Sequence, residues 1–380
     1  MGNINLHVYQ SSFKHESRIL KETKSLVDFG LVDKVFIIAI WENGLKEHEH
    51  LDSRREVWRV RLKTRYLPDG SFWKVLKFIE WWIKIFIRFK KEGITLFNSH
   101  NLLVLPLGVA FKIFVKSKLV YDTHELETET AAMSATRKKI SKMIEKLFVC
   151  HVDSIIVVSD SIAEWYQNQY NLKEVHVIRN VPYSQDIKTK NSTDLKRKLN
   201  IQDNEILYIY QGALDRGRGI EILLNVFSHL NKKKHIVFMG YGVLEDEVKK
   251  YEKNFSNIHF QPAVKPDDVK YYTASADAGI SLIENTCLSY QYSLPNKMFE
   301  YISCGLPLIV SDFPDMGKIV DENKCGWSVP VEKNSVAELI ENISEQELGE
   351  RRKNVLKCKD KFGWHQEEEK LLQLYRNLAL

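Results

Sequence analysis

The chain has 380 residues, of which 44% are hydrophobic, and its 55 Lys and Arg residues stand against 50 Asp and Glu residues. This composition excludes an intrinsically disordered chain, because the apolar surface is large enough to offset the entropy lost on folding. The net charge of +5 is too small, and too little clustered, to indicate a nucleic-acid-binding protein. The length predicts two domains, each with its own core.

Apolar runs that are typical of strands alternate with helical segments along the whole chain. This order predicts an α/β fold of two Rossmann-like, doubly wound domains, each with a parallel sheet. The strands expected in the first half are Ile4–Tyr9, Val35–Ile40, Val57–Leu62, Thr95–Ser99, Lys118–Asp122 and Ser154–Ser159. Those expected in the second half are Ile206–Gln211, His235–Met239, Asn257–Gln261, Asp277–Ile283 and Leu308–Ser311. Ligands of such sheets bind at the carboxyl ends of the strands, so the loops that follow the strands are the candidate binding segments.

Residues 71–93 form an unusual helix within the first half. The segment contains Trp73, Trp81 and Trp82, and its basic residues fall in one stripe, formed by Lys74, Lys77, Lys84, Arg88 and Lys91. A basic, Trp-rich amphipathic helix is typical of a membrane interface. An ordinary helix that covers the sheet and has a solvated lysine edge explains the same pattern. The sequence therefore leaves open whether Ser71–Gly93 contacts an anionic membrane surface.

Two glycine-rich loops of the second half suggest phosphate binding. Gly212–Gly219 follows an expected strand, contains Arg216 and Arg218, and precedes the apolar helix Ile220–Leu230. Glycines let the backbone approach a ligand closely, and arginines beside a helix N-terminus suit an anion. A glycine-rich turn with two solvated arginines is the alternative. The loop Gly240-Tyr241-Gly242 is a second, weaker candidate.

A third loop leads into a helix that should begin near Pro295 and end at Gly305. Glu300 would lie one turn into this helix, close to Lys297. A carboxylate at this place suits the two hydroxyls of a ribose, and the lysine suits a phosphate. The alternative is a surface Lys–Glu pair worth only a few tenths of a kcal/mol.

Together these motifs resemble the GT-B glycosyltransferases, and most closely the family-4 type of bacterial surface-polysaccharide synthesis. The resemblance rests on Gly212–Glu221, Gly240–Gly242, Pro295–Tyr301 with Cys304–Pro307, Ser12–Arg18, Tyr121–Leu126 and Phe362–Trp364. It implies two domains that face a cleft: an acceptor-binding domain over residues 1–182 and a nucleotide-sugar-binding domain over 183–362. Residues 363–380 would form a helix that crosses back to the first domain.

The resemblance also implies site residues. Donor-binding positions would be Gly212, Arg216, Arg218, Gly240, Gly242, Val264, Ser293, Leu294, Asn296, Lys297 and Glu300, with Glu300 on the ribose and Arg218 on the diphosphate. Catalytic positions would be His124, Glu125 and Arg218, and acceptor-binding positions His15, Glu16, Arg18 and His100. For His124 and Glu125, the alternative is an acidic cluster that caps a helix.

Two departures from the family pattern stand in this chain. Tyr292 occupies the place of the first glutamate of the E-x7-E motif, and Ala213 that of an arginine common after the first glycine of the loop. Tyr292 leaves the donor sugar and the stereochemical outcome open. A non-catalytic nucleotide-sugar-binding subunit and a GT-B nucleotide-sugar epimerase are therefore the alternatives to a transferase.

The expected reaction moves a sugar from a UDP- or GDP-hexose donor onto a glycan or lipid-linked acceptor, with retention. We expect no cofactor and no metal, because no Asp-x-Asp occurs in the chain. The five cysteines form no C-x-x-C pair, and residues 1–10 lack an apolar signal region. These features favour a cytoplasmic protein, peripheral on the inner face of the membrane if Ser71–Gly93 touches lipid.

Overall fold

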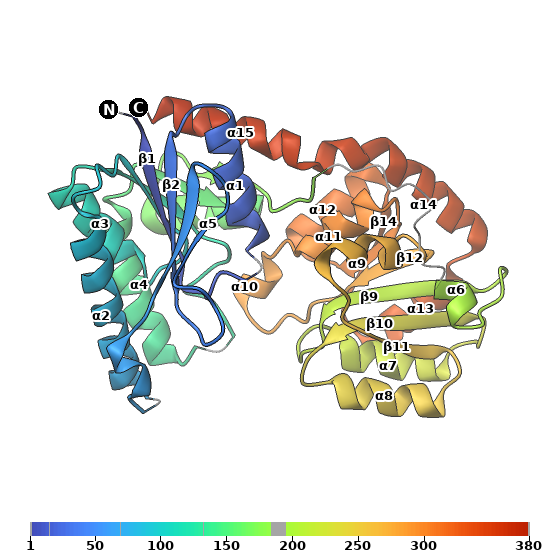
Figure 1. The fold of residues 1–380 in the computed structure, drawn as a ribbon. Coiled ribbons are helices and arrows are strands. Elements are labelled where there is room, and N and C mark those ends of the chain that lie inside the picture. The colour runs from blue at the N-terminus through green and yellow to red at the C-terminus, as the bar shows by residue number, and fades with distance from the viewer. Residues whose placement is uncertain (1, 15, 69, 132, 184–194, 379–380) are drawn as a thin grey trace. The chain divides into compact units, whose positions relative to one another are not determined.

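The computed structural model describes residues 2–14, 16–68, 70–131, 133–183 and 195–378, and the chain divides into two compact units. The first unit comprises Met1–Arg179 and Glu368–Leu380, and the second comprises Asn180–Glu367. Each unit is an α/β structure around one sheet, which confirms the predicted fold class (Figure 1). Part of the polar stretch in which the sequence predicts a domain junction, residues 184–194, lies outside the described residues.

The first unit contains an eight-stranded sheet with the strand order β3-β4-β2-β1-β5-β6-β7-β8. The strands are β1 (Ile4–Val8), β2 (Lys34–Ile40), β3 (His48–His50), β4 (Arg55–Val60), β5 (Leu96–Ser99), β6 (Lys118–Asp122), β7 (Ser154–Val157) and β8 (His176–Val177). Every strand pair is parallel except β3 with β4. β5 and β7 are buried along their whole length, and β2 is buried at every residue except its two ends, because helices cover the sheet.

The helices of the first unit are α1 (Ser17–Asp28), α2 (Ser71–Phe89), α3 (Leu105–Phe114), α4 (Ala135–Val149), α5 (Asp160–Tyr170) and the second part of α15 (Trp364–Asn377). A short 3-10 helix, η1 (Lys63–Tyr66), precedes α2. The helices α2, α3 and α4 lie side by side (Figure 1). The end of α15 packs into this unit, where the Tyr375 hydroxyl accepts a hydrogen bond from the buried Asn98.

The second unit contains a six-stranded, wholly parallel sheet with the order β11-β10-β9-β12-β13-β14. The strands are β9 (Ile206–Ala213), β10 (Lys234–Tyr241), β11 (Ile258–Pro262), β12 (Ala278–Ser281), β13 (Leu308–Ser311) and β14 (Gly326–Val329). The helices are α6 (Leu195–Lys198), α7 (Ile220–His229), α8 (Glu245–Asn254), α9 (Pro266–Thr273), α10 (Leu288–Gln291), α11 (Asn296–Ser303), α12 (Pro314–Asn323), α13 (Lys333–Asn342) and α14 (Glu345–Cys358), and the 3-10 helix η3 (Lys359–Phe362) follows.

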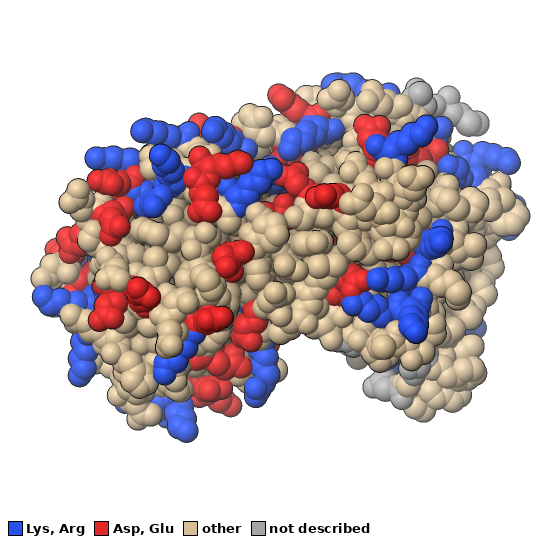
Figure 2. Space-filling view, turned by 180° about the vertical axis from the view of Figure 1, so that it is seen from behind, with Lys and Arg blue, Asp and Glu red and all other residues tan. Residues whose placement is uncertain are grey.

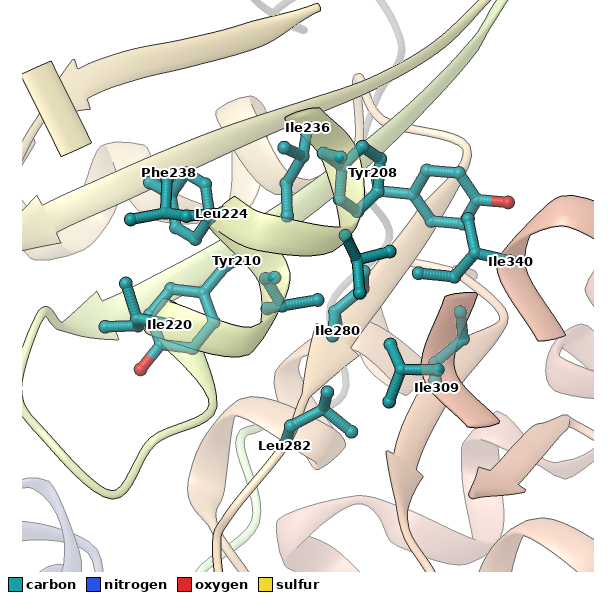
Figure 3. Packing of buried hydrophobic residues seen from close by; sticks show 14 of the residues in the cluster. Tyr208, Tyr210, Ile220, Leu224, Ile236, Phe238, Ile280, Leu282, Ile309 and Ile340 are labelled. Atoms are coloured by element: carbon teal, nitrogen blue, oxygen red, sulfur yellow. The ribbon is translucent and has the colours of Figure 1, made fainter. Parts of the chain in front are cut away.

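The core of the second unit fills the space between the sheet and its helices. Tyr208 and Tyr210 of β9 pack with Ile220 and Leu224 of α7, and Ile280 of β12 lies beside them (Figure 3). All five side chains are fully buried. This packing fixes the carboxyl end of β9, from which the loop Gly212–Gly219 departs.

Every strand that the sequence predicts is present, which confirms the alternating pattern. The short strands β3, β8 and β14 were not expected. Two of them have only two or three residues, and β14 contains a glycine and a serine, so none shows an apolar run. Lys, Arg, Asp and Glu side chains are interspersed on the face shown in Figure 2, in keeping with the small net charge. No helix among the described residues is long and apolar enough to cross a membrane.

Candidate active site

A pocket of about 510 Å³ opens at the carboxyl ends of the strands of the second unit. Its walls come from the ends of β9 and β10, the segment after β11, α9 and the start of α11. Of the predicted donor-binding residues, seven line this pocket: Gly212, Arg218, Gly240, Val264, Asn296, Lys297 and Glu300. The pocket lies where ligands bind in doubly wound sheets.

Two glycines shape the approach to this pocket. Gly240 pairs with Gly212 in the sheet, and a Cβ at Gly240 would lie 1.8 Å from the Gly212 carbonyl oxygen. Gly219 adopts a φ of +70° and directly precedes α7, and a Cβ there would meet the Leu282 side chain at 2.6 Å. A side chain at either position would displace the loop, so the glycines are a steric requirement of this backbone path.

Arg218 and Lys297 give the pocket its positive charge. The Arg218 guanidinium lies 4.8 Å from the centre of the Tyr290 ring, and Lys297 Nζ lies 3.9 Å from that of Tyr210. Neither cation has a carboxylate within ion-pair distance among the described residues. Burial, and then the charge of Arg218, lower the pKa of Lys297 to about 7, although Glu300 opposes the shift. Two cations held close together without a counter-ion favour a bound anion.

Glu300 is oriented by a residue that the sequence analysis missed. The Gln211 side-chain amide donates a hydrogen bond to Glu300 Oε2, and Gln211 Oε1 accepts one from the Thr273 hydroxyl at 2.5 Å. Gln211 and Thr273 are both buried. Gln211 ends the apolar run of β9 directly before Gly212. A polar residue at the end of an apolar strand is the sequence feature that could have indicated its role. The arrangement fixes Glu300 at the pocket wall.

The other predicted donor residues lie outside the pocket wall. The Arg216 side chain is 80% exposed and lies 3.8 Å from Glu221. A Cβ at Gly242 would meet the Leu214 carbonyl oxygen at 2.5 Å, so this glycine packs against the chain itself. Ser293 donates to the Tyr290 carbonyl, and Leu294 is buried. These residues shape the loops around the pocket.

The lowered pKa of Lys297 predicts that nucleotide binding takes up a proton. At pH 8 the empty pocket holds Lys297 mostly neutral, and a bound diphosphate would raise its pKa again. Affinity should therefore fall by up to about tenfold for each pH unit above 7. Calorimetry in two buffers of different ionisation enthalpy measures the proton uptake at pH 8. Lys297→Arg should bind without this uptake, and uptake that persists in Lys297→Arg would assign it to another group.

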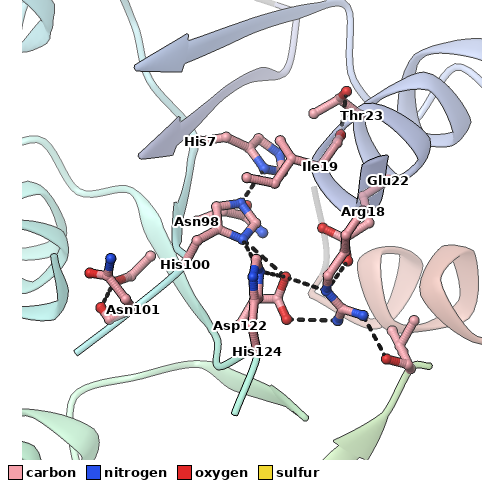
Figure 4. Close-up of polar contacts among 12 residues, drawn as sticks. His7, Arg18, Ile19, Glu22, Thr23, Asn98, His100, Asn101, Asp122 and His124 are labelled. Carbon is pink, nitrogen blue, oxygen red and sulfur yellow. Dashed lines mark hydrogen bonds and ion pairs between the residues drawn. The ribbon is translucent and has the colours of Figure 1, made fainter. Parts of the chain in front are cut away.

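A buried polar network lies at the carboxyl ends of β5 and β6 in the first unit (Figure 4). Arg18 makes two hydrogen bonds to Asp122, at 2.7 and 3.1 Å, and donates a third to the Ile178 carbonyl at 2.8 Å. Arg18 also lies 3.0 Å from Glu22. Because Arg18 is only 4% exposed and its guanidinium is engaged, we assign it a role in positioning Asp122 in place of the expected acceptor contact.

A chain of histidines continues this network. His7 Nδ1 lies 2.8 Å from His100 Nε2, and His100 Nδ1 lies 3.0 Å from Asp122 and 3.2 Å from His124 Nε2. With Asp122 ionised, His100 carries its proton on Nδ1 and accepts at Nε2 from His7. His100 is fully buried, whereas the His124 side chain is 23% exposed. Only His124 of these three can reach a ligand directly.

The charges of this network balance. Burial would raise the pKa of Asp122, but Arg18 and the neighbouring histidines hold it well below its ordinary range. Burial raises the pKa of Glu22 well above its ordinary value in spite of Arg18. Burial also lowers the pKa of His100 to about 4, against the opposing effect of Asp122. The network therefore holds the ion pair of Arg18 and Asp122 beside a neutral Glu22 and a neutral His100.

Two further predicted residues, Glu125 and Glu16, are close in the chain to the network residues His124 and Arg18. Glu125 is exposed, Glu16 precedes α1 and is half-buried, and His15 lies outside the described residues. Glu127 was not among the predicted site residues. Burial, and then the charges of Glu125 and Glu145, raise its pKa to about 8, so Glu127 is largely protonated at neutral pH.

The side chains of His100, Asp122 and His124 are of types that can bind a metal ion. They interact with one another instead, and Asp122 accepts a hydrogen bond from Arg18. This donor set does not suit a resident cation.

Family models match both halves of the chain. Residues 31–181 match the model described as glycosyltransferase family 4, and residues 191–360 match that described as glycosyl transferases group 1. Chitobiosyldiphosphodolichol beta-mannosyltransferase of Kluyveromyces lactis is 19% identical over 315 residues, which cover 74% of this chain and 70% of that protein.

Solved structures show the same fold. Sucrose-phosphate synthase from Thermosynechococcus elongatus superposes with a TM-score of 0.77 at 18% identity, over 99% of both chains. Anabaena HepE in complex with UDP-glucose superposes with a TM-score of 0.74 at 12% identity, over 98% of this chain and 99% of that one. The fold and the matched models define a GT-B glycosyltransferase. The chain belongs to the family-4 type of these enzymes, as the sequence motifs predicted.

Proposed function

We propose that this glycosyltransferase moves a hexose from a UDP- or GDP-sugar onto a glycan or lipid-linked acceptor in cell-surface polysaccharide synthesis, with retention and without a metal. The observation that carries the proposal is the second-unit pocket, where Arg218, Lys297 and Glu300 meet at strand ends. Anabaena HepE, which has a similar fold, binds UDP-glucose, and this supports a nucleotide-sugar donor. The name of the Kluyveromyces lactis relative specifies a sugar-diphosphate-lipid acceptor, which supports a lipid-linked one.

Different pocket residues bind different parts of the donor. Glu300, held by Gln211, accepts hydrogen bonds from the two ribose hydroxyls. Lys297, Arg218 and the free N–H groups at the start of α11 face the diphosphate. When the bond between the sugar and the diphosphate breaks, negative charge grows on the diphosphate. These groups stabilise that charge without having to reorganise, and this lowers the barrier.

Residues of the first unit serve the acceptor in this proposal. His124, whose Nε2 is held by His100 and Asp122 at the end of the histidine chain, hydrogen-bonds an acceptor hydroxyl through its other ring nitrogen. Glu125, which is exposed, and Glu16, which is half-buried, contribute polar contacts from neighbouring positions. With retention, the acceptor proton can pass to the departing diphosphate, so His124 need not act as the base. Membership of the family favours this transfer over an epimerase or a non-catalytic subunit.

Replacing Glu300 with alanine tests the donor assignment. We expect weaker binding of UDP or GDP by about 1.5–3 kcal/mol, because charge-assisted hydrogen bonds to the ribose are lost. Titration calorimetry measures the affinity, and Glu322→Ala, an exposed glutamate of α12, is the matched control. Unchanged affinity in Glu300→Ala would remove Glu300 from the ribose. If neither nucleotide binds the wild type, the proposed donor class fails.

Metal independence is tested with a chelator. We expect transfer to proceed at an unchanged rate in EDTA, because Arg218 and Lys297 supply the positive charge that a cation would otherwise bring. Release of UDP or GDP from the nucleotide-sugar, followed over time, measures the rate. Activity that disappears with EDTA and returns with Mn²⁺ or Mg²⁺ would contradict the proposal.

A further inference from the structure

Two histidines and a glutamate lie together at the edge of the sheet of the first unit. The edge strand β3 carries His48 and His50, which are two positions apart and therefore project from the same face of the strand. In the antiparallel pairing of β3 with β4, His50 lies opposite Glu56, so the glutamate belongs to this face too. We call His48, His50 and Glu56 the β3–β4 triad.

The triad has the dimensions of a metal site. His48 Nε2 lies 3.1 Å from Glu56 Oε2, and His50 Nδ1 lies 3.9 Å from Glu56 Oε1. One ligand atom from each residue falls within 4.8 Å of the other two. A tetrahedral ion with bonds of about 2.0–2.1 Å separates its ligand atoms by about 3.3 Å, so small side-chain rotations would bring all three to one ion. Two imidazoles and a carboxylate suit Zn²⁺ and leave a fourth position for water.

Neighbouring side chains already orient two of the three ligands. The His48 ring stacks on Trp58 with the ring centres 4.1 Å apart, and the Trp58 indole donates a hydrogen bond of 3.0 Å to Glu56. Burial opposes ionisation of this carboxyl, but hydrogen bonds from Lys34, Trp58 and His48 lower its pKa to about 2. An arriving ion would therefore meet an ionised carboxylate and an imidazole ring that are both held in place.

The triad differs from the buried histidine network because solvent reaches it. The side chain of His48 is 34% exposed and that of His50 is 63% exposed. Lys34 pairs with the glutamate of the triad at 2.8 Å but is itself 41% exposed, so it can turn into water when an ion binds. Arg18, which is 4% exposed, has no such freedom to leave Asp122. The triad can thus release its competing cation.

We propose that the β3–β4 triad binds a divalent transition-metal ion such as Zn²⁺, which fastens the edge strand β3 to β4. β3 pairs with β4 over three residues, and an ion with ligands on both strands would add a second connection between them. The site belongs to the first unit and the donor pocket to the second. The inference therefore does not rest on the proposed function and leaves the expected metal independence of transfer unchanged.

Calorimetric titration of the full chain with Zn²⁺ tests the inference. His48→Ala with His50→Ala should lower the affinity by about a hundredfold or more, since loss of an outer-shell partner alone costs about ten- to a hundredfold. His151→Ala with His365→Ala removes two exposed histidines elsewhere and should bind like the wild type. Wild type that binds no Zn²⁺, or a double variant of the triad that binds it as tightly, would overturn the inference.

Substitution of Lys34 gives a test that misfolding cannot imitate. Lys34→Gln should strengthen Zn²⁺ binding by about three- to tenfold, because the ammonium group no longer competes for Glu56 or repels the ion. Lys24→Gln changes an exposed lysine of α1 that pairs with Asp28, and it should leave the affinity unchanged. Unchanged or weaker binding in Lys34→Gln would place the ion away from Glu56 and overturn the proposed site.

Hydrogen exchange shows whether the ion connects the two strands. Zn²⁺ should slow the exchange of backbone amides in His48–His50 and Arg55–Val60 of the wild type, because opening of the strand pair would break metal bonds. The variant that lacks both histidines should show no such change. Exchange that stays the same in these strands when Zn²⁺ is bound would contradict the proposed connection.

Discussion

Replacing Arg218 with alanine is expected to lower turnover by about a hundredfold or more, because the pocket loses a preorganised cation where the diphosphate leaves. Arg218 stacks on Tyr290 and has no carboxylate partner among the described residues, so its charge is available to a ligand. Steady-state kinetics with the nucleotide-sugar donor measures the effect.

The neighbouring Arg216 supplies the control for this experiment. It belongs to the same loop and carries the same charge, but its side chain is 80% exposed and points to Glu221. Arg216→Ala should therefore stay within a few-fold of the wild-type turnover, since an exposed charge acts weakly through solvent. Equal losses in the two variants would show that the loop contributes only a diffuse positive field.

Replacing Arg18 with alanine should destabilise the first unit by about 3–5 kcal/mol, because the Asp122 carboxylate would remain buried without its counter-ion. Denaturant unfolding measures the loss. Arg61→Ala removes an exposed pair with Glu47 and should cost about 1 kcal/mol or less. A similarly small loss in Arg18→Ala would contradict the role we assign to this network.

The Arg18–Asp122 pair also determines how the stability of the first unit changes with pH. The folded-state pKa of Asp122 is lowered, so its contribution to stability is present above the unfolded value of about 4 and is lost as the pH falls toward the folded pKa. In Arg18→Ala the pKa of Asp122 should rise. The stability difference between the variant and the wild type should then shrink on acidification, which unfolding at pH 7 and in mild acid would reveal.

The sequence predicted the sheets and the donor loops because both depend on local patterns. Apolar runs marked each long strand, and glycines at the strand ends marked the loops that line the pocket. Whether Arg216 or Arg218 faces the pocket depends on the turn of the loop, since both residues have the same charge and neighbouring positions. The sequence did not predict the role of Gln211, because that role depends on its contacts with Thr273 and Glu300, which are distant in the chain.

The first unit shows more clearly why local sequence patterns do not predict contacts between distant residues. Arg18 follows a strand, as an acceptor-binding residue should, yet its partner Asp122 is 104 positions away. Only the folded chain brings them together and buries both. For α2 the pattern correctly indicated an amphipathic helix, but not which of its sides the sheet would cover. The buried side carries Trp81, Ile85 and Phe89, and Phe89 packs on Phe36 of β2, a contact that forms only in the folded chain.

The division of the chain also bears on its synthesis by the ribosome. The first unit takes its final piece, Glu368–Leu380, from the end of the chain, after the whole second unit. Tyr375, which is fully buried against Asn98, emerges only after the whole second unit has been made. At about 5–20 residues per second, the nascent first unit would wait tens of seconds with this position unfilled. It therefore begins to fold before the second unit and finishes after it, and a stop codon before Tyr375 would destabilise the first unit, most of which precedes the second.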